Sequence, residues 1–154
     1  MCPAAGGTCS CRTSPARQAV YRSSLSNNDH LFSLSSSEGP GAGYTAEGVG
    51  YFDYPAPCSW GLVPMYRLSN STSGEHFYTA SQGEHDSLVA SGWNDEGSLG
   101  CVATGSVGCS SVPLHRLVQP GGFHMFTTSD GERDALRASG WIDEGEAGFV
   151  WNGM

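Results

Sequence analysis

Long apolar runs, lysine and charge in general are scarce in this 154-residue chain. No run approaches the roughly 18–20 apolar residues that a membrane-spanning helix needs, so the sequence predicts no such helix. All seven basic residues are arginines, which excludes chemistry that depends on lysine, such as a Schiff base or a phosphate-binding P-loop. The net charge is −8, so the chain has no source of affinity for a phosphate backbone and we expect no nucleic-acid partner.

Glycine and cysteine are plentiful by contrast. The 22 glycines and a charged content of only 14% favour short strands joined by tight turns, in a chain long enough for one domain with a real core. An even count of six cysteines favours disulfides. Cys101 and Cys109 flank a segment, VATGSVG, that a hairpin could close, so we expect them to be bonded to each other. The spacing contains no paired CxxC, and we expect no metal and no cofactor.

The cellular location has two readings. The opening MCPAAGGTCSC lacks a basic segment followed by an apolar one, which suits an intracellular protein with free thiols. Alternatively, the methionine stands in place of a removed leader and the protein is secreted, which the cysteine count favours. Asn70-Ser71-Thr72 is a glycosylation sequon that matters only in the second case.

A sequence pattern of about 45 residues occurs three times. The best-matched copies cover residues 63–102 and 112–150, and a fainter copy covers residues 19–52. A search for internal periods therefore decides the architecture. The recurring positions hold arginine (Arg22, Arg67, Arg116), histidine (His30, His76, His124), an aromatic residue (Tyr44, Trp93, Trp141) and glutamate (Glu47, Glu96, Glu144).

Each copy predicts the same series of elements. Two alternating segments, such as MYRL and HFYT, are typical of half-buried strands. A Ser-x-x-Glu capping box follows, in which we expect the serine to cap a short helix and the glutamate to reach back to it. Gly92 and Gly140 should end the helices of copies two and three. Copy one has GPGAG after Ser35, so there we expect a loop. A last strand closes each copy.

Units of this size cannot bury their own apolar faces and must pack on one another. We therefore expect a mainly β fold with short helices, in one pseudo-threefold domain that resembles a β-trefoil or a three-bladed propeller. An N-terminal arm rich in Cys, Gly and Ser should cover residues 1–18, followed by a three-repeat domain, residues 19–154 (19–62, 63–111 and 112–154).

The pattern YRL…HFYT…GW…EG…GFV resembles a three-copy repeat of secreted bacterial and fungal proteins. Such repeats are often attached to cell-wall or polysaccharide hydrolases. The match covers residues 19–152, closely in copies two and three and loosely in copy one. The resemblance implies a lectin-like, non-catalytic module, and it supplies no binding residues. Copy one departs from the pattern at Tyr44 and in its missing helix.

The aromatic and acidic residues near the end of each copy are candidate glycan contacts. Aromatic faces stack on the apolar faces of sugar rings, and carboxylates accept hydrogen bonds from neighbouring hydroxyls. The competing interpretation is that each aromatic residue covers the end of its own helix. The candidate glycan-binding residues are Tyr44, Trp93, Asp95, Trp141, Asp143, His30, His76 and His124.

The recurring arginines and glutamates predict structural ion pairs, namely Arg22 with Glu47, Arg67 with Glu96 and Arg116 with Glu144. The histidines fit a buried, hydrogen-bonded role, a sugar contact, or three imidazoles converging on one metal ion. The acids occur in repeated sets, whereas catalytic groups form one asymmetric constellation, and no Gly-x-Ser-x-Gly elbow is present. We therefore expect no enzyme.

The sequence favours a lectin with two or three equivalent glycan sites. Its expected partners are glycans or glycoproteins, without membrane insertion, and we expect a monomer or a weak homo-oligomer. The alternative is a protein-binding module, such as a secreted protease inhibitor or effector, that uses the VATGSVG insert of copy two.

Overall fold

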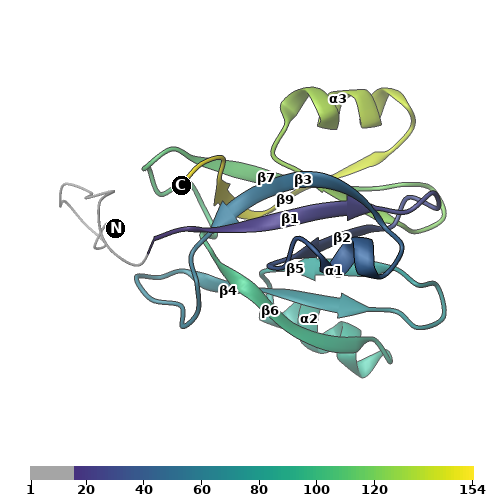
Figure 1. Ribbon diagram of the computed structural model, residues 1–154, viewed down its shortest axis with the longest axis horizontal. Helices are drawn as coiled ribbons and strands as arrows, with labels where there is room; N and C mark the ends of the chain where they lie inside the picture. The colour runs from purple at the N-terminus through teal and green to yellow at the C-terminus, as the bar shows by residue number, and fades with distance from the viewer. Residues whose placement is uncertain (1–15) are drawn as a thin grey trace.

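The computed structural model describes residues 16–154, which fold as three consecutive units (Figure 1). Unit 1 (18–54) contains β1 (Gln18–Ser24), β2 (His30–Ser33), α1 (Glu38–Gly41) and β3 (Thr45–Asp53). Unit 2 (63–103) contains β4 (Val63–Ser69), β5 (His76–Thr79), α2 (Gln82–Ala90) and β6 (Asn94–Val102). Unit 3 (111–151) contains β7 (Ser111–Val118), β8 (His124–Thr127), α3 (Asp130–Ala138) and β9 (Ile142–Trp151). The predicted arm lies outside the described residues, apart from its last three positions.

The first strand of each unit lies between the other two and pairs antiparallel with both. In β1 and β4 the buried residues lie three positions apart, as Val20 and Ser23 do, because the pairing with the closing strand shifts register at a bulge between them. The prediction of a mainly β fold with short helices is confirmed. Units 1 and 3 share a six-stranded sheet in the order β2-β1-β3-β9-β7-β8, and unit 2 forms the three-stranded sheet β5-β4-β6.

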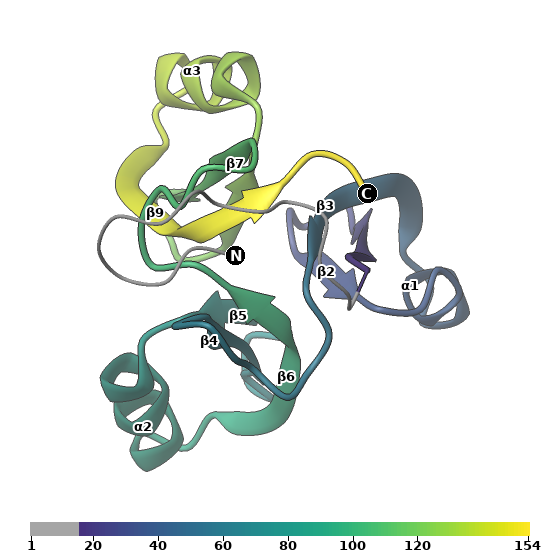
Figure 2. The same cartoon turned by 90° about the vertical axis from the view of Figure 1, so that its left-hand side faces the viewer.

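The ends of the three long closing strands pair with one another where the units meet (Figure 2). Tyr54 of unit 1 pairs with Cys101 of unit 2, and Ala103 of unit 2 pairs with Phe149 of unit 3. Trp151 of unit 3 pairs in turn with Phe52 of unit 1. Each unit thus contacts both others. The three pairs use equivalent positions, because the two residues of every pair lie seven and five positions after the recurring glutamates of their units, Glu47, Glu96 or Glu144.

The core is shared by all three units. Phe32, Tyr78 and Phe126 come from the second strands of the three units, and their rings pack edge to face with centroids 5.1–6.1 Å apart. Each of these residues is at most 2% exposed. Edge-to-face packing suits the charge distribution of aromatic rings, so this cluster stabilises the contact between units as well as burying apolar area.

Helices α2 and α3 begin and end as the sequence predicts. Ser81 accepts a hydrogen bond from the backbone N–H of Glu84 at the start of α2, and Ser129 caps α3 in the same way. Gly92 follows α2 with φ +96°, and the N–H of Trp93 bonds to the carbonyl of Leu88. This is a Schellman motif, in which the glycine takes the left-handed conformation. Gly140, Trp141 and Leu136 repeat it in α3.

The loop predicted after Ser35 is wrong, because residues Glu38–Gly41 form the one-turn helix α1. Pro40 is compatible with this helix, since a first-turn residue needs no intrahelical partner for its N–H. Ser37, not Ser35, occupies the N-cap position, and it makes no side-chain capping bond. Unit 1 therefore retains the helix in shortened form.

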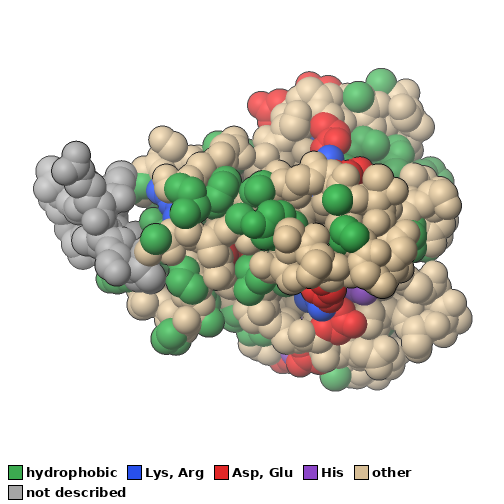
Figure 3. Space-filling model, in the orientation of Figure 1, with side chains coloured by type: hydrophobic (Ala, Val, Ile, Leu, Met, Phe, Trp, Pro, Cys, Tyr) green, Lys and Arg blue, Asp and Glu red, His purple; other side chains and the backbone are tan. Residues whose placement is uncertain are grey.

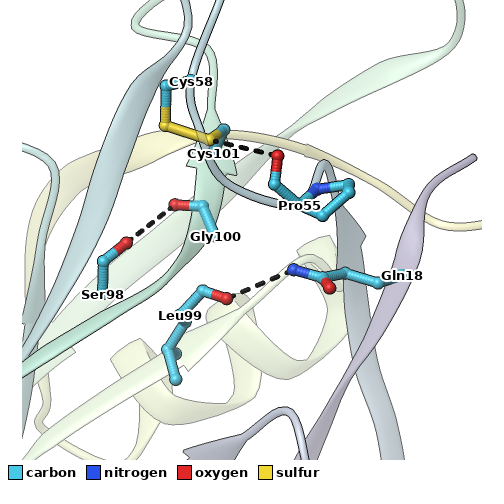
Figure 4. Close-up of a disulfide and its surroundings, with 7 residues drawn as sticks. All are labelled: Gln18, Pro55, Cys58, Ser98, Leu99, Gly100 and Cys101. Carbon is cyan, nitrogen blue, oxygen red and sulfur yellow. Dashed lines mark hydrogen bonds between the residues drawn. A yellow bond between two sulfur atoms is a disulfide. The ribbon is translucent and has the colours of Figure 1, made fainter. Parts of the chain in front are cut away.

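The predicted bond between Cys101 and Cys109 is also wrong. Cys101 is bonded to Cys58, with the two Cα atoms 5.4 Å apart (Figure 4). The segment between β6 and β7 is not a hairpin, because β6 pairs with β4 and β7 pairs with β9. The pairing of Tyr54 with Cys101 instead brings the 54–58 segment beside β6. Cys109 is disulfide-bonded as well, but not to Cys101.

Candidate binding site at the seams between units

An arginine on the first strand of each unit lies beside a glutamate on the last strand of the same unit. The Nε atom of Arg22 lies 2.6 Å from Glu47, that of Arg67 2.9 Å from Glu96, and that of Arg116 3.1 Å from Glu144. The structure thus contains all three ion pairs that the sequence predicts. Each pair connects two neighbouring strands across a bulge, since the register shifts at this level of all three units.

Each arginine also reaches a second glutamate, which belongs to the helix of another unit. Arg22 of unit 1 contacts Glu132 of α3 at 2.7 Å. The same contact joins Arg67 to Glu38 of α1 and Arg116 to Glu84 of α2, both at 2.8 Å. Each seam, defined as the boundary between two units, therefore contains one Glu-Arg-Glu group. Figure 3 shows acidic side chains gathered around basic ones between α1 and unit 2.

These helix glutamates do not complete the predicted capping boxes. The N–H of Ser81 donates to the hydroxyl of Thr79, and that of Ser129 to the hydroxyl of Thr127, both at 3.0 Å. The glutamates are thereby free to reach the arginines. Sequence reasoning missed this role, although three glutamates recurring beside three recurring arginines were a signal for it.

The arginines keep the helix glutamates ionised. Hydrogen bonds from Arg67 are the largest cause of a lowered pKa at Glu38. Burial is the largest influence on the pKa of Glu84 and of Glu132 and acts to raise it, but hydrogen bonds from Arg116 or Arg22 and from a neighbouring threonine, together with the arginine charge, lower both values. None of these carboxyls therefore has the raised pKa that a general acid needs near neutral pH.

Two of the three histidines are held by acids across the seams. His76 Nδ1 lies 2.9 Å from Asp29 of unit 1, and His124 Nδ1 lies 2.5 Å from Glu75 of unit 2. The third, His30, contacts the carbonyl of Asn28 at 2.9 Å. Within residues 16–154, no group of three His, Cys, Asp or Glu side chains is placed to hold a metal ion.

The aromatic residue after each helix is half-buried at the helix end. Trp93 packs against the core, with its ring 6.0 Å from that of Phe77. Tyr44 donates its hydroxyl to Asp29 at 2.5 Å. Burial, together with this hydrogen bond, raises the pKa of Tyr44 above its ordinary value of 10.0. Trp141 occupies the same position after α3.

The predicted acids Asp95 and Asp143 are exposed and contribute to turns. One oxygen of Asp95 accepts the N–H of Gly97 at 2.8 Å, and Asp143 accepts that of Gly145 at 2.9 Å. Both glycines have positive φ, so these hydrogen bonds stabilise the turns. The second oxygen of Asp95 lies 3.2 Å from His85, and this imidazole has a raised pKa, chiefly through Asp86.

Two grooves lie at seams between units, and one of them, groove A, is lined by the Glu-Arg-Glu group of its seam. Groove A has a volume of about 340 Å³ and lies between units 1 and 2; its lining includes Leu34, Ser35, Glu38, Arg67, Glu96 and Ser98. Groove B has a volume of about 260 Å³ and lies between units 2 and 3; its lining includes Ala80, Ser81, Thr104, Glu146, Ala147 and Phe149.

The two grooves are built from matching positions. Ser35 and Ser81 follow the second strands of their units, and Ser98 and Glu146 follow the Glu-Gly of the closing strands. The predicted glycan-binding aromatic residues are not part of either lining. Sequence reasoning missed the grooves because each lies between two units, where no single repeat contains the site.

A family model described as a domain of unknown function, DUF5648, matches residues 19–151. The chain belongs to this family. The match begins one residue into β1 and ends with the last residue of β9, so the family domain comprises all three units. No curated protein and no solved structure matches the chain. Within residues 16–154, no helix is long and apolar enough to cross a membrane.

Proposed function

We propose that this protein is a secreted, non-catalytic, multivalent glycan-binding protein whose sites are the grooves at the seams between units. The observation that carries the proposal is the occurrence of two grooves at matching positions of consecutive seams. Repeated sites on one rigid body raise the apparent affinity for a surface that carries many copies of a ligand. The resemblance to three-copy repeats of secreted proteins supports the same conclusion.

The proposed arrangement of the units is a pseudo-threefold domain of three repeats. Three sets of contacts support it, because each runs from unit to unit and returns to the first. They are the strand pairs at the junction, the ring cluster of Phe32, Tyr78 and Phe126, and the contacts between arginines and helix glutamates.

The chemistry of groove A suits a sugar. Leu34 is 44% exposed and offers an apolar face, while the hydroxyl oxygens of Ser35 and Ser98 can accept hydrogen bonds from a sugar. Glu38 and Glu96 keep free acceptor positions beside the arginine, since a carboxylate accepts at about four sites. The chain has a net charge of −8, so we expect neutral glycans to bind better than anionic ones.

Two further observations support the proposal. The bond between Cys58 and Cys101 is typical of an oxidising compartment, as secretion would provide. The helix glutamates of the seams are held in ion pairs and have lowered pKa values, which supports a binding role over catalysis.

A glycan array followed by calorimetry tests the proposal. Ser98→Arg blocks groove A and Glu146→Arg blocks groove B, and both positions are exposed, so folding should be unaffected. We expect each single variant to lower the binding stoichiometry and the double variant to abolish binding. Ser87→Arg, on the exposed side of α2, is the matched control.

Absence of binding to any neutral glycan would contradict the lectin function. Full binding by the double variant would contradict the location of the sites. In that case Asp95→Ala and Asp143→Ala test the helix-end residues that the sequence analysis singled out.

A further inference from the structure

Asp53, the last residue of β3, is a carboxyl buried where its counterparts are apolar. Its side chain is 0% exposed. Val102 and Val150 occupy the same position relative to the glutamates of units 2 and 3, and both are also 0% exposed. Two units thus place an aliphatic side chain at the junction of the closing strands, and unit 1 places an acid there.

The site leaves this carboxyl without a partner. Neither oxygen of Asp53 has a hydrogen-bond partner among the described residues. Gln18 lies opposite it on β1, but its amide donates to the carbonyl of Leu99 at 3.3 Å (Figure 4). A Cβ added to Gly100 would collide with the carboxylate, so this glycine provides the space in which Asp53 fits.

No cation among residues 16–154 offsets a charge at this position. Arg17 lies directly before β1, but its guanidinium bonds to the hydroxyl of Tyr54 and to the carbonyls of Cys109 and Gly153. Tyr51, on the same strand as Asp53, is the ionisable neighbour, and burial first and Asp53 second raise its pKa well above the ordinary value. Both neighbours therefore leave the acid uncompensated.

The protonated and ionised forms of Asp53 fit this site differently. Burial raises the pKa of Asp53 to about 7, although the amide of Gln18, which lies near the carboxyl without a hydrogen bond of good geometry to it, acts in the opposite direction. A neutral carboxyl is tolerated in an apolar site, whereas an unpaired carboxylate is strongly disfavoured. The charge would appear next to the two strand pairs of this corner, between Tyr54 and Cys101 and between Phe52 and Trp151.

We propose that Asp53 is a pH-sensitive switch in the junction between units 1 and 2, closed while the carboxyl is protonated and loosened when it ionises. The folded form holds the proton to higher pH than the unfolded chain, whose ordinary value is 3.8. The unfolded state therefore binds fewer protons between these two values, and stability falls as pH rises through this window. Below pH 3.8 the carboxyl is protonated in both states, so Asp53 no longer makes stability change with pH.

Denaturant unfolding from pH 4 to pH 8 tests the switch in the wild type, Asp53→Asn and Asp53→Val. We expect the folding constant of Asp53→Asn to rise, relative to the wild type, by roughly several hundred-fold across this range. Asp53→Val reproduces the side chain of units 2 and 3 and should show the same trend. A ratio that stays constant with pH would overturn the proposal.

Two measurements on the wild type do not depend on the variants folding. The carboxyl carbon shift of Asp53 should titrate near neutrality, and a midpoint near 4 would overturn the proposal. The amides of Tyr54 and Cys101 should lose protection from hydrogen exchange at pH 8, corrected for intrinsic rates. The bridge between Ala103 and Phe149 is the internal control, because an equal loss there would show global unfolding instead of a local switch.

Discussion

Arg22 of unit 1 and Glu132 of unit 3, which are 110 residues apart in sequence, form a bidentate ion pair. The two guanidinium nitrogens lie 2.7 and 3.1 Å from the two carboxylate oxygens. Both side chains are partly buried, at 19% and 33% exposed, so the pair is less screened than an ordinary surface pair. This contact is one of three that fasten a helix of one unit to a strand of another.

Glu132→Gln should lower the free energy of unfolding by about 1–2 kcal/mol, because Arg22 loses its charged partner in a partly buried site. Urea denaturation at pH 7 measures the change. Glu146→Gln serves as the control, since the ion pairs found among the described residues do not include this exposed side chain, and its effect should stay within about 0.5 kcal/mol. Equal effects of the two variants would contradict a structural role for the seam.

Gly92→Ala and Gly140→Ala should each cost about 1–2 kcal/mol. These glycines have φ +96° and +94°, and a Cβ would meet nothing within 4 Å, so the cost is conformational and not steric. Gly83→Ala and Gly131→Ala provide matched controls inside the first turns of the same helices. There alanine should stabilise the protein by up to about 1 kcal/mol, because it reduces the freedom of the unfolded chain.

Digestion without reduction, followed by mass spectrometry, should yield a peptide in which Cys58 is bonded to Cys101. The double variant Cys58→Ala, Cys101→Ala should lose about 4 kcal/mol, as expected for a cross-link between residues 43 apart in sequence. Recovery of a peptide that joins Cys101 to Cys109 would restore the pairing that the sequence suggested and refute the structural one.

Asp29→Asn should destabilise the protein by about 2 kcal/mol at pH 7. The carboxylate accepts hydrogen bonds from Tyr44 and from the backbone N–H of His76, and the side chain is 1% exposed. Burial acts to raise its pKa, but the hydrogen bonds of His76 and Tyr44 outweigh it and lower the value.

The pH dependence of this variant follows from the lowered pKa. The stabilisation by Asp29 is complete above the ordinary value of 3.8 and is lost as pH falls through the lower folded value. The difference between the wild type and Asp29→Asn should therefore shrink in acid. A difference that is the same at pH 2 and at pH 7 would show that the charge of Asp29 is not involved.

The sequence predicts what is local and what recurs. Helix caps, the glycines that end α2 and α3, and the pairs of Arg67 with Glu96 and its equivalents depend on one unit and follow from its residues. Features that require a neighbouring unit do not. The partner of Cys101, the second glutamate of each arginine and both grooves depend on how the units meet, which no single repeat encodes.

Asp53 shows a different limit of sequence reasoning. Comparison of the three copies treats a residue that differs from its counterparts as a loss of the pattern. The structure shows that the residue that differs here is an acid at a fully buried position of a junction. The shortened helix of unit 1 is a second case, since GPG was compatible with one helical turn.

The pairing of the closing strands has a consequence for how such a protein can be divided. Each unit offers one strand end to the next unit and accepts one from the previous, so an isolated unit has two unfilled positions. Two further copies of the same unit would fill them. A gene that encodes one unit should therefore yield a homotrimer, whereas a gene that encodes two should leave an open edge that recruits a third.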